Sequence, residues 1–138
     1  SEGLNLYMET QFCFDAETVL AWERAIRESG NALPVRVGIP GPATIKTLFL
    51  FAQISCIGPS MRFIAKQARN VAKLMTVQSP HLLLAGLAGG MADDKGCLIR
   101  HFHYYPFGGF AKTATYADTV AKGYITLTKD GGFDVQAR

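Results

Sequence analysis

The stretch LPVRVGIPGPATIKTLFLFAQIS, residues 33–55, reads as a strand, a turn and a helix in succession. Val35, Val37 and Ile39 alternate with charged or small residues, which is typical of a strand. The Pro-Gly-Pro sequence then ends the strand, because proline withholds a backbone donor and glycine permits unusual dihedral angles. The apolar run that follows predicts a helix over residues 43–55. A strand followed by a helix is the building block of a parallel α/β sheet.

The same order of strand and helix occurs on both sides of this stretch. Upstream, a strand over residues 4–14 precedes Asp15, a helix N-cap, and a helix that continues to Ser29. Downstream, an apolar strand over residues 97–105 precedes a helix over residues 113–122. We therefore predict an α/β fold of three parallel βα units, with the strands side by side in chain order.

Two further helices and a hairpin are expected between and after these units. One helix is predicted over residues 61–76, a second from the Ser79–Pro80 start to Met91, and a hairpin within residues 124–138 about the turn KDGG. The first of these helices carries basic residues on one face: Arg62, Lys66, Arg69 and Lys73. This stripe is either an anion site or, as packing alone would produce, the solvated face of an amphipathic helix.

The composition indicates one folded domain and excludes several classes of protein. Of the 138 residues, 49% are hydrophobic and 18% are charged, which is typical of a globular chain. The net charge of +3 is too small to indicate nucleic acid or membrane as a partner. Cys13, Cys56 and Cys97 are odd in number and widely spaced, which favours reduced thiols and a cytoplasmic protein.

Gln11 is a polar residue inside an apolar strand, near the strand's carboxyl end. Ligands of parallel sheets bind beyond the carboxyl ends of the strands. A carboxamide both donates and accepts, so Gln11 could bind the edge of a heterocycle that carries an acceptor beside a donor. The alternative is that its amide satisfies a neighbouring polar group within the fold.

The third strand ends in HFHYYPFGG, which carries two more candidate groups. His101 and His103 share one strand face and could transfer a proton or ligate a metal, but no third ligand is evident, so no metal site is predicted. Tyr104, Tyr105 and Phe107 either form an aromatic wall for stacking or pack as strand aromatics generally do.

Three stretches together resemble the methylenetetrahydrofolate reductase family. TQFCFDAE resembles the TQFFFD strand and helix start of that family, VRVGIPGPATIKTLFLFAQISCIGPSM resembles the next strand and helix, and HFHYYPFGG resembles the last barrel strand. The order and spacing agree over residues 10–123, with PFGG typical of a bacterial branch.

The resemblance implies a flavin-dependent TIM barrel of one-carbon metabolism. Such enzymes reduce 5,10-methylenetetrahydrofolate with FAD and with electrons from NADH or NADPH. Gln11 matches the strand glutamine that hydrogen-bonds the pterin ring, and His103 and Tyr105 lie in the matching last strand. These three residues are the predicted substrate-binding residues.

The chain also departs from that family. A TIM barrel has eight strands and about 250 residues, whereas three strand units here match the last three of the barrel, without the family's FAD-binding part. Gly108 and Gly109 stand where the family has an asparagine and a substrate-contacting arginine, and Phe63 is the nearest match to its covering aromatic residue. The chain alone is therefore expected to be inactive.

A partial (β/α)8 barrel leaves its first and third strands as unpaired edges. We therefore expect a homodimer or higher homo-oligomer that covers residues 6–14 or residues 99–105 and binds a folate-type small molecule. The alternative to an oxidoreductase is a non-catalytic half-barrel, an oligomeric protein without flavin that binds a flat ligand or has no small-molecule site.

Overall fold

The computed structural model describes residues 3–55 and 73–136. Its strands and helices follow in this order: β1 (Met8–Phe12), α1 (Ala16–Glu28), β2 (Val35–Pro40), β3 (Ala43–Thr44), α2 (Ile45–Ile54), β4 (Val77–Gln78), α4 (His81–Asp93), β5 (Ile99–Tyr105), α5 (Phe110–Ala121), β6 (Ile125–Leu127) and β7 (Phe133–Val135).

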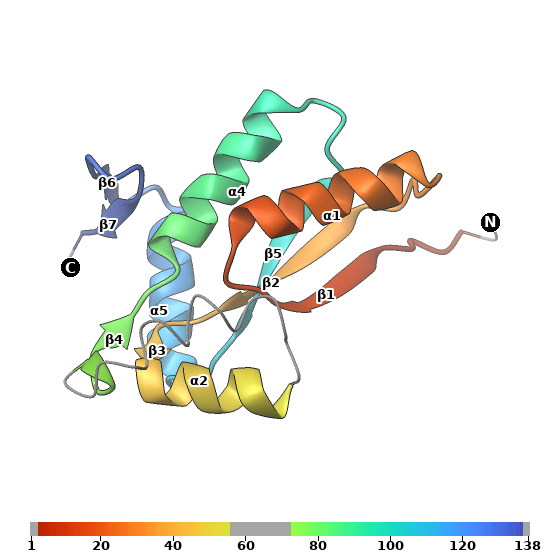
Figure 1. Ribbon diagram of the computed structural model, residues 1–138. Helices are drawn as coiled ribbons and strands as arrows, with labels where there is room; N and C mark the ends of the chain where they lie inside the picture. The colour runs from red at the N-terminus through yellow and green to blue at the C-terminus, as the bar shows by residue number, and fades with distance from the viewer. Residues whose placement is uncertain (1–2, 56–72, 137–138) are drawn as a thin grey trace.

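Three parallel strands form the central sheet in the order β1-β2-β5, as predicted from the sequence. Helices α1 and α4 lie side by side across one face of this sheet, and α2 lies beyond the carboxyl ends of the strands (Figure 1). The described strands form an open sheet and do not close into a barrel. The α/β class and the strand order are therefore confirmed, and the partial barrel stays a prediction.

The core lies between the sheet and its helices. Val35, Val37 and Ile39 of β2 and Ile99 of β5 have no exposed surface, and they pack in one cluster with Leu87 of α4. The alternation read from the sequence thus directs every second residue of β2 toward the helices. The residues between them, beginning with Arg36, face the other side of the sheet.

We call that other side the open face, defined by Glu9, Arg36, His101 and His103. Arg36 pairs in register with Glu9 on one side and with His101 on the other. His103 pairs with Gly38. Because residues paired across strands share a face, charged and imidazole groups from all three strands lie together here.

The three strands and α5 differ from expectation mainly at their ends. β1 begins at Met8 rather than at residue 4, because residues 4–7 run beyond the paired part of β2. β5 begins at Ile99, because the Cys97 amide donates to the Asp94 carbonyl at 3.0 Å in the preceding turn. Helix α5 begins at Phe110, directly after Gly109 with its φ of 107°.

The predicted Asp15 cap and the hairpin are confirmed, whereas Pro80 is the N-cap of α4 and not its first helical residue. Asp15 accepts a hydrogen bond from the Thr18 amide at 2.9 Å, and Gly30 follows α1 with a φ of 99°. Strands β6 and β7 pair antiparallel around the predicted turn. The two-residue ladder of β3 and β4 is an addition that the sequence does not signal.

Most of the helix predicted over residues 61–76 lies outside the described residues, together with three of the four residues of its basic stripe, Arg62, Lys66 and Arg69. Residues 73–76 form a turn. Phe63 also lies outside the described residues. Within residues 3–55 and 73–136, no helix is long and apolar enough to cross a membrane.

Candidate functional site

A bulge in β1 decides which side chains meet at the carboxyl end of the sheet. Glu9 pairs with Arg36 but Phe12 pairs with Gly38, so β1 advances three residues while β2 advances two. The Gly38 amide donates to the Thr10 hydroxyl at 3.0 Å, which holds the extra residue in place. A side chain at Gly38 would meet the Gln11 carbonyl oxygen at 2.7 Å, so glycine permits this close approach.

The bulge moves Gln11 away from the open face. Strict alternation from Glu9 would pair Gln11 with Gly38 on the open face, but the extra residue shifts the phase and pairs Phe12 with Gly38 instead. The exposed Gln11 side chain lines a hollow of about 400 Å³ with Thr18 and Trp22 of α1.

One half of the Gln11 carboxamide is engaged within the chain. Its Oε1 accepts from the Phe12 amide at 3.3 Å. Among the described residues, no hydrogen bond is made by its Nε2. The donor group of this amide therefore remains available to a ligand.

His103 is fixed on the open face by two groups from β1. Its Nε2 lies 3.1 Å from the Thr10 carbonyl oxygen, which can only accept, so Nε2 donates. Its Nδ1 then faces Glu9 Oε1 at 3.8 Å. His103 therefore connects β5 to β1 across β2. Its imidazole ring also packs against the Tyr105 ring, with the two ring centroids 5.2 Å apart.

An aromatic cluster occupies the carboxyl end of the open face. The Phe12 ring, only 2% exposed, packs edge-on against three other rings, those of Phe14, Tyr105 and Phe107, at centroid distances between 4.7 and 5.7 Å. Phe107 stacks in turn on Phe51 of α2 at 4.3 Å. Burial raises the pKa of Tyr105, and the negative charge of Glu9 raises it by a smaller amount.

The structure therefore brings two of the three predicted substrate-binding residues together. His103 and Tyr105 are neighbours on the open face, whereas the Gln11 side chain lies in the hollow beside α1. The proposed aromatic wall is also divided, because Tyr105 and Phe107 stack while Tyr104 points to the helix side, toward Tyr116. Burial raises the pKa of Tyr104 to about 12 and raises that of Tyr116 further.

The glycines after β5 have a structural reason. A side chain at Gly108 would meet the Pro42 carbonyl oxygen at 2.0 Å, so the loop after β5 packs directly on the loop after β2. Gly109 has a positive φ of 107°, which disfavours other residues. An arginine or asparagine at these positions would not fit this loop.

A small apolar pocket lies beyond the end of β2. Pro40, Gly41, Ile45 and Leu83 are among its lining residues, and its volume is about 100 Å³. Pockets for cofactor-sized ligands hold about 300–1,000 Å³, so this one is too small for a pterin or a flavin. No group of three or more His, Cys, Asp or Glu side chains suited to a metal occurs in residues 3–55 and 73–136.

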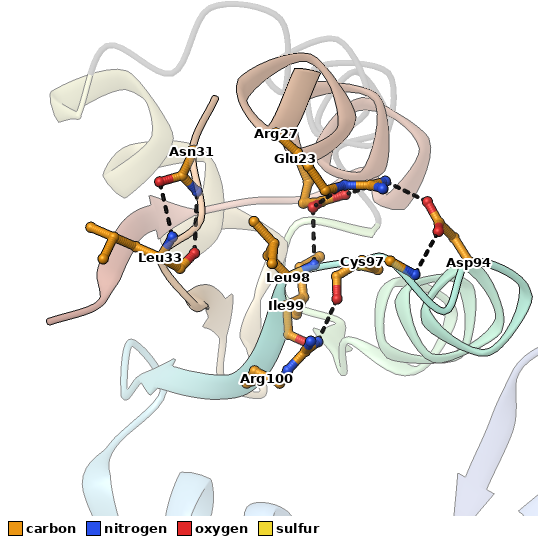
Figure 2. Close-up of polar contacts among 10 residues, drawn as sticks. Glu23, Arg27, Asn31, Leu33, Asp94, Cys97, Leu98, Ile99 and Arg100 are labelled. Carbon is orange, nitrogen blue, oxygen red and sulfur yellow. Dashed lines mark hydrogen bonds and ion pairs between the residues drawn. The ribbon is translucent and has the colours of Figure 1, made fainter. Parts of the chain in front are cut away.

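A polar cluster that the sequence did not reveal lies at the opposite end of the sheet (Figure 2). Glu23 is 1% exposed, and its Oε1 accepts from the Leu98 amide at 2.9 Å and from Arg27 Nε at 3.1 Å. Arg27 also pairs with Asp94. Two hydrogen bonds lower the pKa of Asp94 below its usual value, the larger effect coming from the Gly96 amide and the smaller from the Arg27 guanidinium. This cluster joins α1 and α4 to the start of β5 and serves stability.

Glu9 and Arg36 are the charged residues of the open face that sequence reasoning passed over. The alternation of β2 already placed Arg36 on the side of the sheet that faces away from the core, and this pattern could have identified it as an open-face residue. Comparison with protein families supplies no further assignment, since no family model matches the chain.

Proposed function

We propose that the chain is the folate-binding, carboxyl-terminal part of a methylenetetrahydrofolate reductase-like barrel. Gln11 would bind the pterin edge through its carboxamide at the hollow beside α1, whereas His103 and Tyr105, which lie on the open face, would line the interior of the completed barrel. The complete barrel would reduce 5,10-methylenetetrahydrofolate with FAD and a nicotinamide.

One observation carries this proposal. The Gln11 amide is exposed at the carboxyl end of a parallel strand, its Nε2 makes no hydrogen bond among the described residues, and it lines a hollow of about 400 Å³. That size falls within the range of small-molecule pockets. The half-buried indole of Trp22 lines the same hollow and offers an aromatic surface to a flat ring.

The described residues do not fit FAD. The aromatic cluster around Phe12 fills the carboxyl end of the open face, and the small apolar pocket near Pro40 holds about 100 Å³. No chemical step is therefore assigned to a flavin on this chain alone. Flavin binding and turnover would require the part of the barrel that this chain does not supply.

The proposal can be tested through Trp22, which is the single tryptophan of the chain. Because Trp22 lines the hollow with Gln11, titration with folic acid is expected to quench its fluorescence. Gln11→Ala should weaken binding about tenfold, the equivalent of one lost net hydrogen bond. Gln53→Ala, an exposed glutamine on α2, is the matched control. Equal binding by the Gln11 and Gln53 variants would refute the assigned role of Gln11.

A non-catalytic half-barrel is the second candidate function. Phe12 is only 2% exposed, and this burial favours the half-barrel. In a chain without flavin, a well-packed aromatic cluster fills the carboxyl end of the sheet. The visible absorption spectrum of the purified protein separates the two candidates. Flavin bands near one per chain would support an enzyme in which oligomerisation completes the barrel, whereas a colourless protein that still binds folate would support the half-barrel.

A further inference from the structure

Thr10 lies in the bulge of β1, and its hydroxyl both accepts and donates a hydrogen bond. The hydroxyl accepts from the Gly38 amide of β2 at 3.0 Å and donates to the Gln11 carbonyl oxygen at 2.7 Å. A hydroxyl has one proton to donate and can accept at the same time. The only donor of the Thr10 side chain is thus committed to the backbone of Gln11, and its acceptor ties that backbone to the neighbouring strand.

Two side chains hold the Gln11 carbonyl group. The Cys13 thiol donates to the same oxygen as the Thr10 hydroxyl does, at 3.3 Å. Glycine at position 38 leaves room for this carbonyl, since a Cβ there would lie 2.7 Å from its oxygen. Because the backbone of Gln11 is fixed in this way, the direction in which its side chain leaves the strand is fixed as well. That direction leads to the hollow beside α1.

The backbone carbonyl of Thr10 provides a second attachment for the bulge. It accepts from His103 Nε2 of β5 at 3.1 Å, so the peptide group between Thr10 and Gln11 is also held from the open face. One residue therefore fixes the bulge through its hydroxyl to β2 and through its carbonyl to β5. Removal of the hydroxyl alone would deprive the Gly38 amide of its acceptor and release the first of these attachments.

We infer that Thr10 is a positioning residue whose hydroxyl directs the Gln11 carboxamide into the hollow beside α1. Thr10 lines the same hollow, but its donor is already engaged by the Gln11 carbonyl oxygen, so it acts through Gln11 and not on the ligand. The inference deepens the proposed function and rests on it, because positioning matters only if a ligand binds the Gln11 amide.

Titration with folic acid, followed by Trp22 fluorescence, tests this role. Thr10→Val keeps the shape of the side chain but removes the hydroxyl, and it should weaken binding about tenfold, as Gln11→Ala does. Thr10→Ser keeps the hydroxyl and should bind as wild type does. The double variant, Thr10→Val with Gln11→Ala, should bind no more weakly than Gln11→Ala alone, because both changes remove one contact. A loss of about a hundredfold, the product of the two single effects, would overturn the inference.

Thr44→Val is the matched control for a general loss of stability. It makes the same substitution and removes a hydroxyl that accepts from the Thr47 amide at 3.2 Å, at the start of α2. It should leave folic acid binding unchanged, and circular dichroism would verify that each variant is folded. If Thr44→Val weakened binding as much as Thr10→Val, the role assigned to Thr10 would be wrong.

A crystal structure of the Thr10→Val variant without ligand separates this inference from the proposed function. The Gln11 side chain should be displaced from the hollow in Thr10→Val and should keep its place in Thr10→Ser. A Gln11 side chain that stays in place in Thr10→Val would overturn the inference whether or not folic acid binds. A wild type that binds no folic acid, combined with a displaced Gln11 in the variant, would refute the proposed function and support the positioning role of Thr10.

Discussion

Replacing Glu23 with alanine is expected to destabilise the fold strongly although the residue lies far from the candidate site. The carboxylate is 1% exposed and accepts hydrogen bonds from the Leu98 amide and from Arg27 (Figure 2). Its removal leaves the Leu98 N–H without a partner at the start of β5. The connection between α1, α4 and the central sheet is lost at the same time.

The size of this effect follows from two contributions. An unsatisfied buried amide costs about 1–3 kcal/mol, and each lost buried methylene adds about 0.8 kcal/mol. Glu23→Ala should therefore lower the free energy of unfolding by about 2–4 kcal/mol. For a chain of this size, about 1 kcal/mol shifts Tm by about 3 °C, so Tm should fall by roughly 6–12 °C. Glu23→Gln keeps an acceptor for the Leu98 amide and should lose only about 1 kcal/mol.

Urea unfolding followed by circular dichroism measures these differences directly. Glu28→Ala, an exposed glutamate on the same helix, is the matched control and should change stability by at most about 0.5 kcal/mol. If Glu23→Ala were no more destabilising than Glu28→Ala, the structural role of the cluster would be refuted. If Glu23→Gln lost as much as Glu23→Ala, the hydrogen bond to Leu98 would not be the main contribution.

Two further predictions concern backbone packing and pH. Gly38→Ala places a methyl group 2.7 Å from the Gln11 carbonyl oxygen and should lower the free energy of unfolding by about 1–3 kcal/mol, measured by thermal unfolding. Gly89→Ala is the control, because a methyl group there meets nothing within 4 Å, and it should be neutral or stabilising. Equal effects of the two variants would contradict the bulge geometry. Burial raises the pKa of Tyr104 to about 12, so the folded state holds this proton more tightly than the unfolded chain, whose tyrosines titrate near pH 10. The contribution of Tyr104 to stability should be fully present below about pH 10 and be lost as pH rises toward about 12. Tyr104→Phe should lessen this loss, measured by urea unfolding at a series of pH values. A dependence of stability on pH that Tyr104→Phe leaves unchanged would contradict the prediction.

Much of the fold is predictable from local sequence signals. Alternation in β2, the Asp15 cap and the positive-φ Gly30 all act over a few residues, so their positions follow from the sequence alone. The parallel order of the strands then follows from the repetition of strand and helix. The hairpin at the end of the chain was signalled in the same way by its turn residues.

The candidate site depends on contacts that no local pattern encodes. The bulge in β1 arises because the Gly38 amide bonds the Thr10 hydroxyl, a contact between residues 28 positions apart. The bulge reverses the faces of Gln11 and Phe12 relative to simple alternation. The polar cluster around Glu23 likewise needs the Leu98 amide, 75 positions away. Such contacts are visible only once the three strands are placed side by side.

Isothermal titration calorimetry of 5-methyltetrahydrofolate with the wild-type chain and with Gln11→Ala would test whether Gln11 recognises a pterin. We expect one site per chain, with affinity about tenfold weaker in the variant because one net hydrogen bond is lost. The Gln53→Ala control should bind as wild type does. No binding by the wild type, or equal binding by the wild type and the Gln11 variant, would contradict the claim that Gln11 recognises a pterin.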